Sequence, residues 1–263
     1  MKEQVRGEVL LSRDGAIATV TLSNPERLNA LSASMWEQLG SHMHNLDQDL
    51  SLRCVILRGA GDKAFAAGAD IANFATERAN AKQAKQYAQR FVGSMRALAE
   101  CRHPVVAAIR GACVGGGLLV ASQADIRICG ESSRFGVPVK NLGLVEAYDE
   151  LQGMMRVVGR AATLELLLEG RIWEAREAFD KGLVNRVVAD DAVFTEAQAT
   201  AQRIAEGAPL AARWHKKFVR RLADPRPLSE AEFDESYACF DTEDFKEGVA
   251  AFLAKRKPQF KGK

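Results

Sequence analysis

The chain has 263 residues, of which 47% are hydrophobic, enough for one large domain or for one domain with a helical appendage. Its 36 lysine and arginine residues almost balance 34 aspartate and glutamate residues, which gives a formal net charge of +2 and no reason to expect a nucleic-acid or acidic partner. The first residues are charged throughout, and no apolar stretch approaches the roughly 18–20 residues of a membrane span. We therefore expect a cytoplasmic protein without a membrane partner.

Strands and helices are predicted to alternate over residues 1–190. Gly7–Ser12 and Ala16–Leu22 flank an Asp-Gly pair, which is typical of a hairpin. A helix is expected from about Ser34, because Ser34-Met35-Trp36-Glu37 has the form of a capping box. Buried strands are predicted at Cys54–Leu57, Val105–Ile109, Ile126–Cys129 and Leu183–Val188, and helices at Ala79–Cys101, Leu118–Ala124 and Ala161–Leu168. This alternation indicates an α/β core.

Residues 191–263 are predicted to be helical throughout. The helical patterns run over Ala192–Glu206, Pro209–Ala223, Ser229–Phe240 and Glu243–Arg256. No flexible linker precedes them. The sequence therefore predicts an α/β core over residues 1–190 and a helical region over residues 191–263.

The cysteines and histidines give no sign of a metal site. The five cysteines are irregularly spaced and form no CxxC pair, so buried reduced thiols are expected. His42 and His44 are only two positions apart on a predicted helix, so their side chains diverge. We expect no metal.

Two segments rich in small residues stand out as candidates for chemistry. Lys63–Ile71 follows one predicted strand, and Gly111–Leu119 follows another and opens a helix. The run Gly115-Gly116-Gly117 removes every side chain that would keep a ligand from the unpaired backbone N–H groups of a helix start. The run does not fit the GxGxxG pattern of dinucleotide-binding proteins, and the sequence has no GxxxxGK[ST] phosphate-binding loop. The two segments suggest a pair of backbone donors for an oxyanion, against the simpler alternative of tight helix–strand packing.

These segments and others along nearly the whole chain resemble the crotonase family, the enoyl-CoA hydratase/isomerase superfamily. The matching motifs are Asn24–Leu31, Phe65–Ile71, His103–Ile109, Gly111–Gly117, Ala124–Ile126, Phe135–Pro138, Leu142–Leu144, Gly170–Arg171 and Ala175–Val188. The resemblance implies a spiral of ββα units with a C-terminal helical trimerisation region. It also implies a homotrimer or a dimer of trimers, an acyl-CoA substrate, and no cofactor beyond the coenzyme A of that substrate.

The resemblance also implies roles for particular residues. The oxyanion would be held by the N–H groups of Ala69 and Gly116. Coenzyme A would lie along Arg27, Leu28, Ala30, Ala66, Ala69, Asp70 and Ile71, and Lys255 or Lys257 would meet its phosphates. Tyr237 would border the acyl pocket together with Leu119 and Val139.

The sequence departs from the family at the acid/base positions. Hydratases of the family usually carry glutamates where this chain has Leu119 and Val139, and some relatives carry an aspartate where it has Ala147. Apolar side chains there cannot activate water. A routine hydratase is therefore disfavoured, and Glu146 is the leading candidate to transfer the proton. Asp149 and Glu150 are expected to be solvated residues that open the next helix.

Alternative functions stay open at this point. The chain could run an isomerase, hydrolase or decarboxylase reaction with Glu146, or it could be a catalytically weak acyl-CoA-binding homologue. RNA binding would need a basic stripe, for which the only candidate is the cluster Arg213, Lys216, Lys217, Arg220 and Arg221, otherwise interpreted as a solvated helix face. Asp125 is expected to cap backbone N–H groups, and His103 to be structural.

Overall fold

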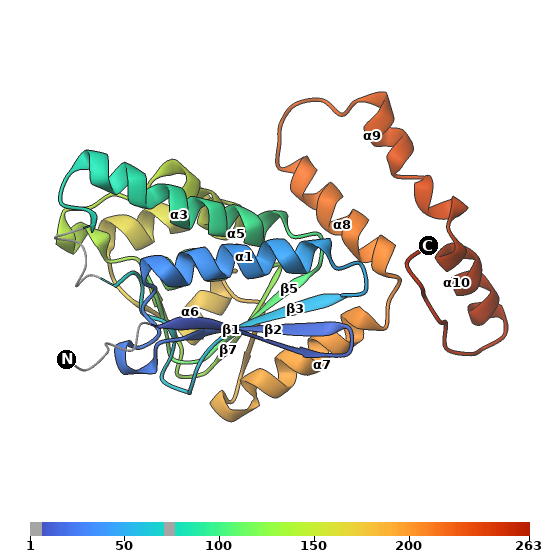
Figure 1. The fold of residues 1–263 in the computed structure, drawn as a ribbon, viewed down its shortest axis with the longest axis horizontal. Helices are drawn as coiled ribbons and strands as arrows, with labels where there is room; N and C mark the ends of the chain where they lie inside the picture. Colours follow the sequence, from blue (N-terminus) through green and yellow to red (C-terminus); the bar gives the residue numbers. More distant parts are fainter. Residues whose placement is uncertain (1–6, 71–76) are drawn as a thin grey trace.

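A computed structural model describes residues 7–70 and 77–263. Two sheets form the centre of the fold (Figure 1). The larger sheet has six strands in the spatial order β1 (Glu8–Asp14), β2 (Ile17–Ser23), β3 (Cys54–Gly59), β5 (Val105–Ile109), β7 (Ile126–Gly130) and β10 (Arg186–Val188). The smaller sheet has four strands in the order β4 (Ala64–Ala66), β6 (Ala112–Val114), β8 (Arg134–Gly136) and β9 (Trp173–Glu174).

Helices follow pairs of strands along the chain. The main helices are α1 (Ala33–Gln48), α3 (Ala81–Glu100), α4 (Gly116–Ala121), α5 (Tyr148–Glu169), α6 (Ala175–Asp180), α7 (Val193–Ala205), α8 (Pro209–Leu222), α9 (Glu230–Glu235) and α10 (Glu243–Leu253). Short 3-10 helices lie at η1 (Pro25–Arg27), η3 (Val139–Leu142), η4 (Asp190–Ala192) and η5 (Ala238–Asp241). In each of the units β3-β4-α3, β5-β6-α4 and β7-β8-α5, the first strand joins the larger sheet and the second joins the smaller one. This arrangement confirms the predicted spiral of ββα units.

The larger sheet is buried on both faces because its central strands are apolar at most positions; the charged exceptions are Arg58 near the end of β3 and Arg127 in β7. Along β3, Val55 and Leu57 join the core that contains α1 and α3, whereas Cys54 and Ile56 pack with α7 on the other face. Successive residues of a strand point to opposite faces, so one continuous apolar run serves both layers. Figure 1 shows α1 and α7 on opposite sides of this sheet. Helix α7 lies within the predicted helical region, residues 191–263, but it packs against the larger sheet as part of the core.

Several predicted boundaries were wrong, each for a local reason. Helix α1 begins at Ala33, one residue from the predicted start, but its capping residue differs: the hydroxyl of Ser32, and not that of Ser34, accepts the N–H of Met35 (3.3 Å). Helix α5 extends well before the predicted start, with a kink at Gly159, whose φ of 70° interrupts the helical pattern. The predicted helix Ser229–Phe240 is divided into α9 and η5, and between them the hydroxyl of Ser236 bonds the carbonyl of Phe233.

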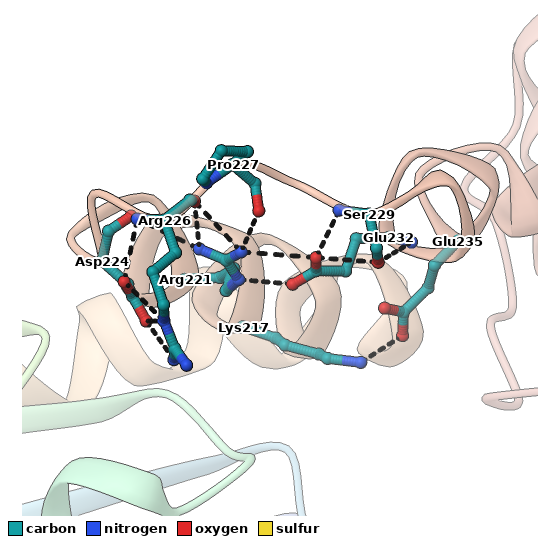
Figure 2. A network of polar contacts seen from close by, with 8 residues as sticks. All are labelled: Lys217, Arg221, Asp224, Arg226, Pro227, Ser229, Glu232 and Glu235. Carbon is teal, nitrogen blue, oxygen red and sulfur yellow. Dashed lines mark hydrogen bonds and ion pairs between the residues drawn. The ribbon is translucent and has the colours of Figure 1, made fainter.

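The helices α8, α9 and α10 form a C-terminal arm that projects from the sheets (Figure 1). The connection between α8 and α9 is held by ion pairs, shown in Figure 2. Arg221 pairs with Glu232, and Lys217 pairs with Glu235. Glu232 also accepts the backbone N–H of Ser229 (2.8 Å), which closes a capping box at the start of α9.

Two further observations concern the chain as a whole. No helix in the part of the chain that the structure describes is long and apolar enough to cross a membrane. The five cysteines are free thiols, and all except Cys239 are buried, as the sequence predicted.

Candidate active site

The pairing of two very short strands brings the two small-residue segments together. β4 and β6 are parallel neighbours, with Ala64 opposite Ala112 and Ala66 opposite Cys113. Parallel strands end at the same edge of a sheet, so the residues that follow them meet there. Gly68 and Ala69 follow β4, and Gly115 and Gly116 follow β6.

Glycine is required at this junction because backbone meets backbone. A β-carbon on Gly117 would lie 2.1 Å from the carbonyl oxygen of Ala66, and one on Gly111 would lie 1.9 Å from that of Lys63. Gly68 (φ 106°) and Gly115 (φ 52°) adopt conformations that are strained for any other residue. Tight packing, one of the two interpretations of the glycine run, therefore applies at Gly117.

The N–H groups of Ala69 and Gly116 have no hydrogen-bond partner among the described residues. Leu31 pairs with the residues on either side of Ala69: its carbonyl accepts the N–H of Asp70 (3.0 Å), and its N–H donates to the carbonyl of Gly68 (2.8 Å). In this parallel pairing the N–H of Ala69 itself points away from Leu31. Gly116 is the first residue of α4, where an N–H has no partner within the helix. A β-carbon on Gly116 would lie only 3.5 Å from the nitrogen of Ala69.

Both segments open onto a cavity of about 480 Å³. Most of its wall is apolar, and includes Trp36, Phe91, Met95, Leu119, Val139 and Leu142. Its charged residues are Arg78, Lys85, Glu146 and Glu150. The sequence-predicted residues Ala69, Gly116, Leu119, Val139 and Glu146 therefore line one cavity.

Glu146 precedes helix α5 and shares the cavity wall with Glu150, which is in the first turn of that helix. Burial raises the pKa of Glu146 above the usual value of 4.5, and the charge of Glu150 and a hydrogen bond to it raise it further. The pKa of Glu150 is also raised, chiefly by burial. Glu150 does open the helix as predicted, but its carboxyl group faces the cavity and not only solvent.

Sequence reasoning missed Glu150 and Arg78 as site residues. The sequence signal for Glu150 was its position three residues after Ala147, because a glutamate at the third position of a helix often folds back to the N-cap residue. In the structure its Oε2 accepts the N–H of Ala147 (2.5 Å). Arg78 stacks on the ring of Tyr87 at 3.8 Å, and its charge lowers the pKa of both glutamates. No pattern in the sequence marked it.

The residues expected to hold coenzyme A lie along the edge beside the cavity. Arg27 pairs with Asp70 (2.5 Å), and Leu28 is 42% exposed in a left-handed conformation. The carbonyl of Leu28 accepts the N–H of Ala67 (2.9 Å), which joins this loop to the donor segment. Ala30 and Ala66 are buried, so their side chains offer little contact surface. Ile71 lies outside the described residues.

Tyr237 and Lys255 are on the C-terminal arm and are exposed, Tyr237 by 67%. Neither is among the described residues that line the cavity. Among residues 7–70 and 77–263, no cluster of three histidine, cysteine, aspartate or glutamate side chains could hold a metal ion.

The remaining polar candidates have structural contacts. Asp125 accepts the N–H of Val105 (2.7 Å), which confirms its predicted capping role, and it also pairs with Lys216 (2.7 Å). His103 is fully buried. The basic residues of α8 are not a purely solvated face, because each is bonded elsewhere in the chain: Arg213 to Leu50, Lys216 to Asp125, Lys217 to Glu235, Arg220 to Ala99 and Arg221 to Glu232.

A spiral of ββα units with adjoining glycine-rich donor segments is the crotonase fold, and comparisons with known proteins agree. A crystal structure of an enoyl-CoA hydratase/carnithine racemase from Magnetospirillum magneticum superimposes with a TM-score of 0.95 at 55% identity, over 97% of this chain and 96% of that one. A probable enoyl-CoA hydratase of Mycobacterium bovis is 38% identical over 96% of this chain and 97% of its own length. A short-chain-enoyl-CoA hydratase of Clostridium acetobutylicum is 33% identical over 95% of each. The enoyl-CoA hydratase/isomerase family model matches residues 12–263, and the chain belongs to this family.

Proposed function

We propose that the protein is an enzyme that binds an acyl-CoA, holds the thioester oxygen between the N–H groups of Ala69 and Gly116, and moves a proton on the acyl group with Glu146. The observation that carries the proposal is the cavity itself. Two unpaired backbone donors and a carboxyl group with a raised pKa line it together. Family membership supports an acyl-CoA as the substrate.

The two donors would stabilise the charge that develops on the thioester oxygen. When a proton leaves the carbon next to the carbonyl, negative charge moves to that oxygen as an enolate. A fixed N–H aimed at such a charge contributes about 3–4 kcal/mol. The backbone that carries the donors is fixed by the glycine contacts at Gly111 and Gly117, so little reorganisation accompanies the reaction.

Glu146 is suited to transfer protons because its pKa is raised toward neutrality. Leu119 and Val139, at the positions where the resemblance implies hydratase glutamates, present apolar side chains to the same cavity. An apolar wall there gives water neither a base nor a hydrogen-bond partner. This favours migration of a double bond over addition of water.

The proposal includes a place for coenzyme A and for the arm. Arg27, Leu28 and the backbone at Ala30 and Ala66, with Asp70 and Ile71, would hold coenzyme A at the edge of the cavity. The arm exposes a set of large apolar side chains: Phe233, Tyr237, Phe240, Phe252 and Leu253. Exposure of this size is typical of an interface. We propose a homotrimer or dimer of trimers in which the arm, with Tyr237 and Lys255, contacts a neighbouring copy. Light scattering measures the molar mass in solution, and the mass of a monomer would contradict this proposal.

The central test measures turnover and binding separately. Crotonyl-CoA, trans-3-hexenoyl-CoA, a dienoyl-CoA and a β-ketoacyl-CoA would be offered to the wild type, to Glu146→Gln and to the exposed neighbour variant Asp149→Asn. We expect turnover of the 3-enoyl substrate, its loss in Glu146→Gln, and unchanged binding of the CoA thioester. Asp149→Asn should behave as the wild type.

Two results would contradict the proposal. Full activity in Glu146→Gln would remove Glu146 from the mechanism. Tight binding of CoA thioesters by the wild type without turnover of any of them would favour a binding protein that retains the fold, for which the apolar Leu119 and Val139 are the supporting observation.

A further inference from the structure

One face of helix α3 lines the cavity with side chains of two sizes. Four of its residues recur at intervals of three and four positions and line the cavity: Ala84, Ala88, Phe91 and Met95. This spacing places them in one stripe along the helix. Phe91 and Met95 are large and buried, whereas Ala84 and Ala88 are small and half-buried. The stripe therefore leaves more room at its N-terminal end than at its C-terminal end.

The large side chains of the stripe lie beside the proposed oxyanion donors. The ring centroids of Phe91 and Trp36 are 6.0 Å apart. A β-carbon on Gly116 would lie 3.3 Å from the ring of Trp36. Since Ala84 comes seven residues before Phe91, it lies about 10 Å further along the helix axis. An acyl group that starts at the donors and follows α3 toward its N-terminus therefore passes from the aromatic rings to the two alanines.

The segment Leu142–Val145 presents exposed apolar side chains to the same cavity. Leu142 is 53% exposed and Val145 is 90% exposed, although both line the cavity together with Leu144. Apolar surface of this kind at a cavity is typical of a ligand-binding groove, because an apolar ligand displaces water from it favourably. We call Leu142, Leu144 and Val145 the apolar lip of the cavity.

We propose that the acyl group is an apolar chain longer than a butanoyl group, and that its distal part lies along Ala84 and Ala88 and ends at the apolar lip. This inference rests on the proposed function and names the class of acyl group that the same site takes. The two alanines set the usable length, because a larger side chain at either position would fill the space that the tail needs.

The charged residues of the cavity suggest an acyl group that ends in a carboxylate as the alternative. They are Arg78, Lys85, Glu146 and Glu150. Lys85 is exposed, so its ammonium group can stay in water while an apolar tail contacts its methylene groups. The guanidinium of Arg78 stacks on the ring of Tyr87 at 3.8 Å, and its charge acts on the two glutamates. These contacts favour the apolar tail.

Saturated thioesters separate the two kinds of acyl group without any turnover. Isothermal titration calorimetry would compare the Kd values of butanoyl-, hexanoyl-, octanoyl- and decanoyl-CoA, with adipoyl-CoA as the carboxylate-ended counterpart of hexanoyl-CoA. Each methylene group that moves from water to an apolar wall tightens binding by up to about fourfold. We expect the Kd of the wild type to fall by about tenfold from butanoyl- to hexanoyl-CoA and again to octanoyl-CoA. Adipoyl-CoA should bind more weakly than hexanoyl-CoA.

Leucine at the two alanines should end the gain in affinity at different chain lengths. Ala88→Leu fills space nearer the donors, so the gain should stop at a shorter chain than in Ala84→Leu, which is one helical turn further out. Butanoyl-CoA should bind both variants as tightly as the wild type. The control Gln86→Leu adds the same side chain at an exposed position of α3 that is not among the described residues lining the cavity, and it should keep the wild-type series. Ala84→Leu remains informative if Ala88→Leu does not fold.

The apolar lip has its own matched pair of variants. Val145→Ser should weaken binding of decanoyl-CoA several-fold and leave that of butanoyl-CoA unchanged, because only a long tail reaches the lip. Tyr148 is equally exposed, at 91%, but is not among the described residues that line the cavity. Tyr148→Ser should therefore keep the wild-type Kd for both thioesters.

Three results would overturn the inference. The first is a wild-type Kd that does not change with chain length, and the second is an unchanged series in both Ala84→Leu and Ala88→Leu. The third is tighter binding of adipoyl-CoA than of hexanoyl-CoA, which would favour a carboxylate-ended acyl group beside Arg78 and Lys85. The proposed function fails separately: a length-dependent series without turnover of any substrate removes the reaction and leaves the acyl site, whereas turnover with a flat series does the reverse.

Discussion

The amide nitrogen of Ala69 lies so close to Gly116 that a methyl group on Gly116 would be 3.5 Å from it and 3.3 Å from the indole of Trp36. Any side chain on Gly116 would therefore begin in contact with both the amide of Ala69 and the ring of Trp36. Neither local sequence indicates the distance between the two residues. It is set by the register in which β4 pairs with β6.

Gly116→Ala should obstruct the space between the two donors. The added methyl group would occupy the place proposed for the thioester oxygen, so we expect kcat/KM to fall by about 10²–10³-fold, as when one oxyanion donor is lost. The matched control is Gly93→Ala, on helix α3, where an added β-carbon meets nothing within 4 Å. That control should keep full activity and gain roughly 0.5–1 kcal/mol of stability. A fully active Gly116→Ala enzyme would exclude the proposed oxyanion site.

Val139→Glu should introduce hydratase activity. It places a carboxylate in the cavity wall at a position where the resemblance implies one, and a general acid/base typically contributes 10²–10⁴-fold. We expect hydration of crotonyl-CoA to rise by about 10²-fold, measured as formation of 3-hydroxybutyryl-CoA. Val139→Gln has nearly the same size and transfers no proton, so it should stay at the wild-type rate. Equal rates in the two variants would show that the apolar residue is not what limits hydration.

Arg27→Ala should weaken binding of coenzyme A thioesters without slowing the chemistry. Arg27 is 45% exposed and pairs with Asp70 at the edge of the cavity. We expect KM to rise several-fold with kcat unchanged, because a contact made equally in the ground and transition states affects only KM. The free energy of unfolding should fall by no more than about 1 kcal/mol. Arg13→Ala removes a comparably exposed ion pair with Asp49 and should leave KM unchanged; a matching rise in KM there would contradict a specific role for Arg27.

His103 should make the protein sensitive to acid. Burial, with the nearby charge of Arg213, lowers the pKa of His103 to about 4 from 6.5, so the folded state holds the neutral imidazole while the unfolded chain takes up a proton. Stability from this group is fully present above pH 6.5 and is lost as the pH falls toward 4, by on the order of 3 kcal/mol.

The variant His103→Leu should show a shallower loss of the free energy of unfolding between pH 6.5 and pH 4.5, whatever its stability at neutral pH. His44 is exposed on α1, and His44→Leu should keep the wild-type slope. Denaturant unfolding at several pH values measures both. Parallel pH curves for His103→Leu and the wild type would show that His103 is not the sensor.

The two segments rich in small residues, Lys63–Ile71 and Gly111–Leu119, and the apolar strands were predicted from the residues alone. Cys54–Leu57 and Val105–Ile109 are runs of buried residues bounded by polar ones, and such runs form central strands wherever they lie in the chain. The strands β4, β6, β8 and β9 were not predicted, because two or three residues are too few to show a period. These short strands nevertheless bring Ala69 to Gly116.

Of the two glutamates that line the cavity, one was predicted from the sequence and the other was found only in the structure. The apolar residues at 119 and 139 and the nearby acid Glu146 were visible in the sequence, because they depend only on which side chain stands at each position. The placement of Glu150 depended on the direction in which its side chain turns, and the unpaired N–H of Ala147 at the start of α5 decides that direction.

The sequence by itself determined the alternation of strands and helices and the two glycine- and alanine-rich segments, because these follow from side-chain size, polarity and order along the chain; its motifs also carried the resemblance to the family, which implied the ββα spiral. Only the tertiary structure decided that the donors share a cavity with Glu146, that Glu150 joins them, and that Tyr237 and Lys255 lie on an arm away from that cavity. The reason is physical. Which groups meet depends on strand register, helix capping and the path of the chain in space, and these are settled by packing between segments far apart in the sequence.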